Sequence, residues 1–122
     1  MTIDGAIQEI NSLKPNIYSD FQKISWLSDL DGQLFRETLL THEDSPEEFT
    51  GYTESTDRNT ELIVKEPYSR LYITWLECRI DYYNAEYGKF NNSNAVFNAE
   101  LTAWRNWYNR THMPKGEKGK YW

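Results

Sequence analysis

The stretch PYSRLYITWLECRIDYYNAEYGKFNNSNAVFNAELTAWRNWYNR, residues 67–110, decides the fold. In its first half, apolar and aromatic residues recur at helical spacing on two stripes. This pattern predicts a helix from Pro67 to about Tyr87 that is covered on two sides. Pro67 suits the first position of a helix because the N–H that it lacks would have no intrahelical partner. Gly88 is expected to end this helix in a left-handed conformation.

The second half of the same stretch predicts the last helix of the chain. The polar residues 91–93 are expected to form a turn and to cap this helix, which runs to about Arg110. Its main stripe consists of Phe97, Leu101, Trp104 and Tyr108. Because the connection between the two helices is short, they are expected to form an antiparallel hairpin.

Two further helices are predicted before this hairpin. Residues Thr2–Leu13 carry isoleucines at helical spacing, and Pro15 stops that helix. Ser19 and Gln22 have the spacing of a capping box, which begins a longer helix to about Thr41. The sequence therefore predicts an all-α fold: a small helical bundle with a C-terminal antiparallel helix hairpin, a long acidic loop and an extended C-terminal tail.

Length and charge limit the classes of protein to consider. The 122 residues suffice for one domain, expected over residues 1–113, with the tail over 114–122. The net charge of −6 argues against a protein that binds nucleic acid through a basic face. The single cysteine cannot form an internal disulfide, and no apolar run approaches the ~20 residues of a membrane span. The N-terminus lacks a signal-peptide pattern, so we expect a reducing compartment and no membrane partner.

Residues 42–66 differ in character from the rest of the chain. They hold eight acidic residues against Arg58 and Lys65, and no helical period runs through them. A connection of this length within one domain is typically functional or mobile. Glu61–Val64 has the composition of a short strand. The candidate contact residues of this acidic loop are Glu43, Asp44, Glu47 and Glu48.

The search for reactive side chains favours structural roles. His42 lies in an acidic run without the spacing of a metal motif, and His112 stands alone. Cys78 is expected to be a buried structural thiol. Asp29 and Asp31 are two positions apart on a helix and point to different faces, so they form no acid–base pair. We therefore expect no catalytic residue, no metal site, no cofactor and no enzyme activity.

Arginines alternate with aromatic rings in the last two predicted helices. Arginine and aromatic residues are the preferred types at the centre of protein interfaces, and they also build platforms for single-stranded nucleic acid. The stretch is close to neutral, which favours a protein interface, while packing of arginine stems on core rings remains an alternative. The candidate residues of a subunit interface are Tyr68, Tyr72, Arg79, Tyr83, Arg105 and Trp107.

The C-terminal half resembles phage head–tail adaptor proteins, also called connector or head-completion proteins. The resemblance is carried by Val64-Lys-Glu-Pro-Tyr68 at the helix start, followed by Leu71-Tyr72 and Trp75-Leu76. It continues from Asn84 through Phe97-Asn98 to Trp104 and to Trp107-Tyr108-Asn109-Arg110. Its pattern is one of helices and rings without a diagnostic motif.

This resemblance implies a structural virion protein that is made in the cytoplasm of a bacterial host and lies at the head–tail junction. Such adaptors form a ring, commonly of twelve copies, under the portal protein, and they extend the DNA channel toward a neck or tail protein. Their C-terminal tails often insert into the portal. For this role the tail offers Lys115, Lys118 and Lys120 as charge partners and Tyr121 and Trp122 as anchors. The acidic loop would face a basic neighbour or line the lumen, where like charge keeps DNA from adhering.

One alternative comes from a different class of protein. Clustered acids on a small phage-type protein also suit an inhibitor or regulator that imitates DNA and binds a nucleic-acid enzyme. Mimicry needs a rigid array of negative charge, however, whereas these acids lie in a loop and the helices are nearly neutral. The sequence therefore favours the adaptor.

Overall fold

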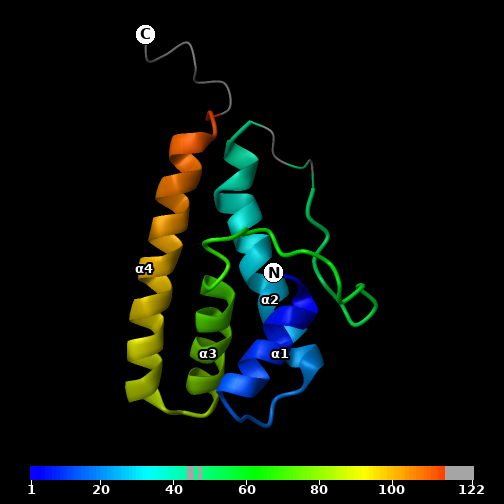
Figure 1. The fold of residues 1–122 in the computed structure, drawn as a ribbon, viewed down its shortest axis with the longest axis vertical. Coiled ribbons are helices and arrows are strands. Elements are labelled where there is room, and N and C mark those ends of the chain that lie inside the picture. Colours follow the sequence, from blue (N-terminus) through cyan, green and yellow to red (C-terminus); the bar gives the residue numbers. More distant parts are fainter. Residues whose placement is uncertain (44–45, 47, 115–122) are drawn as a thin grey trace.

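The computed structural model describes residues 1–43, 46 and 48–114, and its regular structure is helical (Figure 1). The helices are α1 (Ile3–Leu13), α2 (Asp20–Glu37), the short 3-10 helix η1 (Leu39–Thr41), α3 (Leu71–Tyr83) and α4 (Tyr87–Thr111). Over the described residues there is no β-strand, and only Thr2 with Glu61 and His42 with Pro114 form isolated bridges. The expected all-α class is confirmed.

Polar side chains begin the first two helices where the sequence predicts them. The Thr2 hydroxyl accepts the N–H of Gly5 at 2.9 Å, and the Ser19 hydroxyl accepts the N–H of Gln22 at 3.0 Å. Each bond satisfies an N–H group that the first helical turn leaves without a partner. The predicted caps at Thr2 and Ser19 are therefore confirmed, although α2 ends at Glu37 and the chain continues as η1.

The start of α3 differs from the prediction. Pro67 does not begin the helix, which starts four residues later at Leu71. Between them the backbone forms successive turns, in which the N–H of Tyr68 donates to Lys65 O and the N–H of Leu71 donates to Tyr68 O. A proline can open a turn as well as a helix, because both accept its fixed φ.

The turn between α3 and α4 also lies elsewhere than predicted. It comprises residues 84–86, and Ala85 takes the left-handed conformation with φ of 58° that was expected of Gly88. Gly88 and residues 91–93 lie inside α4. Ser93 does not cap the helix, because its hydroxyl lies 3.0 Å from Asp81 Oδ2 and 3.1 Å from the carbonyl of Lys89 one turn earlier.

Helix α3 is the centre of the fold. It contacts α1, α2 and α4, and in Figure 1 it lies between α4 on one side and α1 and α2 on the other. α3 and α4 run side by side in opposite directions. The residues that α3 buries therefore point to several sides: Leu71, Tyr72, Ile73, Thr74, Leu76, Cys78, Ile80 and Asp81.

The irregular segment 48–70 is fixed against the helices. Its backbone pairs with the start of the chain, since Ile3 N–H donates to Thr60 O at 3.0 Å and Leu62 N–H donates to Met1 O at 2.9 Å. Leu62 and Val64 are fully buried in the core. The strand expected at Glu61–Val64 is limited to the single bridge from Glu61 to Thr2. None of the described helices has the length and apolar character to span a membrane.

Candidate functional site

Exposed apolar side chains gather at the end of the molecule that holds the α3–α4 turn. α1 ends at this end too, beside the linker that joins it to α2 (Figure 1). We define the aromatic surface as Leu13, Ile17, Tyr82, Tyr83 and Tyr87, which are 56, 93, 46, 56 and 60% exposed. Single exposed apolar residues are ordinary, but several that neighbour one another indicate a contact surface.

Ring contacts hold the tyrosines of this surface in place. Tyr83 stacks on Trp26, with ring centroids 5.5 Å apart and an interplanar angle of 15°. Tyr82 contacts both Tyr83 and Tyr87 edge-on. Tyr18 joins the cluster through Trp26, and its hydroxyl donates to Asn84 Oδ1 at 2.7 Å in the turn. The rings are therefore ordered before any partner binds, which lowers the entropy cost of binding.

Two buried ionic groups lie beneath the aromatic surface. Lys14 Nζ is 2.6 Å from Asp81 Oδ1, and the Ser93 hydroxyl donates to the same carboxylate, so one acid joins α1, α3 and α4. Lys23 Nζ donates to Asn11 Oδ1 at 2.7 Å and to Tyr18 O at 2.8 Å. Burial lowers the pKa of Lys23 while Asp20 opposes this effect. These contacts fix the linker that carries Ile17.

The predicted interface residues do not gather at one place. Tyr83 belongs to the aromatic surface, but Tyr68 packs against Trp107 near the far end of α4, at a centroid distance of 5.5 Å. Arg105 binds Glu37 of α2 at 2.9 Å. These contacts fall within the chain itself, as in the alternative of internal packing.

Two further members of the predicted interface have internal contacts. The Arg79 guanidinium lies 4.5 Å from the Trp75 ring centroid and also approaches Tyr82 and Phe90. Tyr72 is fully buried and offers no surface to a partner. We therefore leave Tyr72 out of any proposed interface, because its stripe of α3 faces the core.

A buried carboxylate, which the sequence did not single out, lies behind the segment 48–70. Asp31 is fully buried on α2. The hydroxyls of Tyr52 and Tyr72 each donate to it at 2.6 Å, and the N–H of Ile63 donates at 3.1 Å. The Tyr72 hydroxyl also accepts the N–H of Val64 at 2.7 Å. Asp31 thus joins α2, α3 and two parts of the irregular segment.

The electrostatics of this carboxylate follow from its burial. Loss of water raises the pKa of Asp31, while the bonds from Tyr52, Tyr72 and Ile63 and the charge of Lys65 oppose that rise. Burial and the neighbouring carboxylate raise the pKa of both tyrosines, which stay protonated as donors. The carboxylate has no exposed surface, so its arrangement suits a structural tie rather than a reaction with a substrate.

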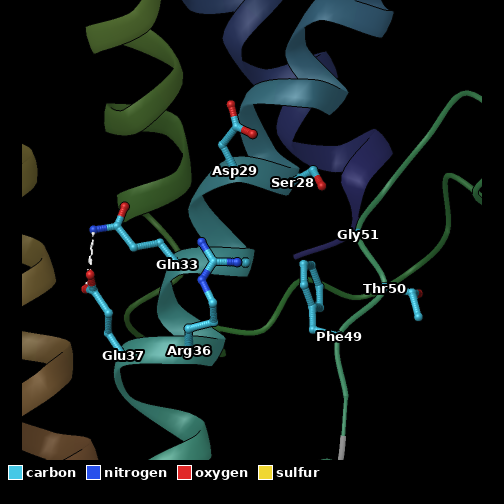
Figure 2. A pocket seen from close by; sticks show the side chains of 9 residues that line it. Ser28, Asp29, Gln33, Arg36, Glu37, Phe49, Thr50 and Gly51 are labelled. Atoms are coloured by element: carbon cyan, nitrogen blue, oxygen red, sulfur yellow. Dashed lines mark hydrogen bonds between the residues drawn. The ribbon is translucent and has the colours of Figure 1, made fainter.

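An open groove runs along α2 beside the segment 48–51. Its volume is about 530 Å³, and Figure 2 shows Arg36 between Gln33 and Phe49, with Asp29 farther along the helix. The groove is lined by Ser28, Asp29, Gly32, Gln33, Arg36, Glu37, Phe49, Thr50 and Gly51. We call it the α2 groove. Gly32 permits its floor, because a Cβ there would lie 3.4 Å from Arg36 and 3.5 Å from Phe49.

The opposite end of the molecule fastens the chain where α4 ends. Pro114 forms a bridge with His42, and Glu43 N–H donates to Met113 O at 2.8 Å. The Tyr108 ring lies between two imidazoles: His112 stacks on it at 3.8 Å, and His42 meets its edge at 5.0 Å. We call this contact the C-terminal clasp. His42 is buried in it, whereas the sequence predicted an imidazole in a solvated loop.

The remaining candidates are placed as follows. Glu48 is exposed and Glu43 half-buried, whereas Asp44 and Glu47 lie outside the described residues. The tail residues Lys115, Lys118, Lys120, Tyr121 and Trp122 also lie outside them. Cys78 is buried as expected, and burial raises the pKa of its thiol. Among described side chains, no three of His, Cys, Asp or Glu form a group that could hold a metal ion.

Comparisons with family models, with curated proteins and with solved structures found no match. The functional argument therefore depends on the geometry of this chain.

Proposed function

We propose that this chain is a structural protein-binding subunit, a head–tail adaptor of a phage-type virion, that contacts its neighbours through the aromatic surface. The observation that carries the proposal is that surface itself: three exposed tyrosines and two exposed aliphatic residues at one end of the molecule. Tyrosine combines a large apolar area with a hydroxyl that can find a partner in an interface.

The distribution of contact surfaces along the molecule also supports an adaptor. The aromatic surface occupies one end, while the C-terminal clasp, from which the chain continues beyond Pro114, occupies the other (Figure 1). A protein that joins two components needs two separate surfaces, and here the helices α3 and α4 hold them apart. In the proposed assembly the aromatic surface contacts the portal protein or the next copy in a ring of about twelve, and the tail inserts into the portal.

Surface ion pairs weigh against the alternative of a DNA mimic. Arg58 binds both Asp4 and Asp20, Arg70 binds Glu9, and Arg105 binds Glu37. Acids that are neutralised by neighbouring arginines do not present a free array of negative charge. The overall net charge of −6 still suits a protein that lines a DNA channel without binding the DNA.

The test is binding of the purified chain to the portal protein encoded in the same genome. The double variant Ile17→Ser/Tyr87→Ser removes the two most exposed members of the aromatic surface. We expect its affinity to fall about 30-fold or more, because a central apolar contact contributes about 2 kcal/mol. Titration calorimetry measures the change.

The matched control is Val96→Ser, which removes an apolar side chain of α4 that is 54% exposed and outside the aromatic surface. It is expected to bind like the unchanged protein. A double variant with unchanged affinity, or a genome that encodes no portal protein, would contradict the proposal.

A further inference from the structure

The α2 groove contains two charged side chains without ionic partners. Among the described residues, no hydrogen bond or ion pair is formed by the side chains of Asp29 and Arg36, although both line the groove. The other acid, Glu37, already binds Arg105 and Gln33. A carboxylate and a guanidinium that lie free in one groove indicate a ligand with both a positive and a negative group.

The wall opposite α2 offers unused backbone groups. Thr50 and Gly51 form no backbone hydrogen bond with any described residue, whereas the next N–H, that of Tyr52, donates to Ser28 Oγ at 2.9 Å. Gly51 has φ of 86°, a conformation that favours glycine. Free N–H and C=O groups beside charged side chains suit a peptide in extended form more than a compact small molecule.

The chain's own C-terminal segment fits this description. Residues 115–122 contain three lysines against one glutamate, a formal surplus of two positive charges in a chain whose net charge is −6. The described chain ends at Pro114, which the C-terminal clasp holds against His42. His42 follows the Arg36 end of the α2 groove by six residues, so the segment begins close to it.

We propose that residues 115–122 bind in the α2 groove of the same chain, antiparallel to α2, with Glu117 beside Arg36 and Lys120 beside Asp29. Polyproline II geometry rises about 3.1 Å per residue and returns to the same side every third residue. Three residues, from Pro114 to Glu117, thus advance about 9 Å. On a helix, the six positions from His42 to Arg36 correspond to about 9 Å.

The second ion pair follows in the same register. Asp29 lies seven positions before Arg36 on α2, about 10.5 Å along the helix axis. Lys120 lies three residues after Glu117, about 9 Å farther along the segment and on the same side. Both charges therefore meet their complements, while Lys118 points to another side. This inference is independent of the adaptor function, and portal binding would have to draw the tail out of the groove.

The test uses the full chain and two-dimensional amide NMR. The reporters are the backbone amides of Thr50 and Gly51 and the side-chain amide of Gln33, all in the groove. Lys120→Glu should shift these signals and leave those of α3 unchanged. Lys118→Glu is the matched control, with the same change of charge, and should leave the reporters in place. Asp29→Lys combined with Lys120→Glu should restore the original positions.

Three results would overturn the inference. Equal shifts from Lys118→Glu and Lys120→Glu would indicate unspecific attraction without the proposed register. Reporters that respond to neither variant would show that the segment lies elsewhere. Shifts that vary with protein concentration, together with a doubled mass in light scattering, would place the segment in the groove of a second copy. None of these measurements requires a portal protein, so their failure is distinct from failure of the adaptor proposal.

Discussion

The helix pair α3–α4 and the segment 48–70 are both held in place, but by different interactions. Between the helices, order comes from apolar rings at helical spacing, such as Phe97 and Trp104, which are almost fully buried. The segment has no such period. It is fastened by Leu62 and Val64 in the core and by donors that converge on the carboxylate of Asp31.

This difference shows that an irregular segment can depend on one polar residue. Many side chains share the stabilisation of a helix pair, so one change lowers the stability of the whole without releasing a part. Asp31 is the common acceptor for Tyr52, Tyr72 and Ile63, so its loss affects all three at once. The following substitutions test this contrast, from the largest expected effect to the smallest.

Trp104→Ala should lower the free energy of unfolding by about 4 kcal/mol, because it removes a ring that is 2% exposed and leaves a cavity. Trp107→Ala, on the next turn of α4 and only half-buried, is the control and should cost about 2 kcal/mol. Urea denaturation measures both. Equal losses would mean that the helix pair does not depend on the buried stripe.

Asp31→Ala should lower the free energy of unfolding by about 3 kcal/mol, because it leaves buried donors without an acceptor. Asp29→Ala removes an exposed acid two residues earlier and should change stability by less than about 0.5 kcal/mol. Hydrogen exchange should show that Asp31→Ala exposes the amide of Ile63 before those of α3. Loss of protection in both at once would contradict the contrast.

The pH dependence of this tie has a defined sign. The folded-state pKa of Asp31 is raised by burial, so between the unfolded pKa, about 3.9, and the higher folded pKa the native protein binds more protons than the unfolded chain. The stability contribution of this titration therefore falls as pH rises through that window. We expect the stability difference between the unchanged protein and Asp31→Asn to grow on acidification. A difference that shrinks would contradict the assigned direction.

Arg58→Ala should have the smallest effect, about 0.5 kcal/mol. Arg58 joins the segment to Asp4 of α1 and Asp20 of α2, but all three side chains are more than a third exposed, so solvent screens the pairs. Thermal unfolding at low and high salt measures the contribution. A loss as large as that of Asp31→Ala would show that surface pairs, and not the buried carboxylate, hold the segment.

The sequence predicted what depends on local rules. The caps at Thr2 and Ser19 were correct because a short polar side chain before an apolar period has few alternatives. The turn between α3 and α4 was misplaced because Gly88 and residues 91–93 have turn-forming types yet lie within α4, where Ser93 finds a distant partner in Asp81. Tertiary contacts outweighed local preference there.

The candidate sites were harder to predict, because they join residues far apart in the sequence. Asp31 did carry a signal, an acid on the apolar stripe between Leu27 and Leu34, but its partners Tyr52 and Tyr72 follow 21 and 41 residues later. Tyr72 was assigned to an interface because its type is common there, and the buried carboxylate explains why it lies inside. Which rings remain exposed depends on packing and not on composition.

The most direct test of the proposed function is hydrogen–deuterium exchange of the chain with and without the portal protein from the same genome. The adaptor proposal predicts that portal binding adds protection to residues 10–21 and 80–90, which contain the aromatic surface, while the middle of α4 exchanges as before. Added protection confined to residues 42–66, with 80–90 unchanged, would contradict it.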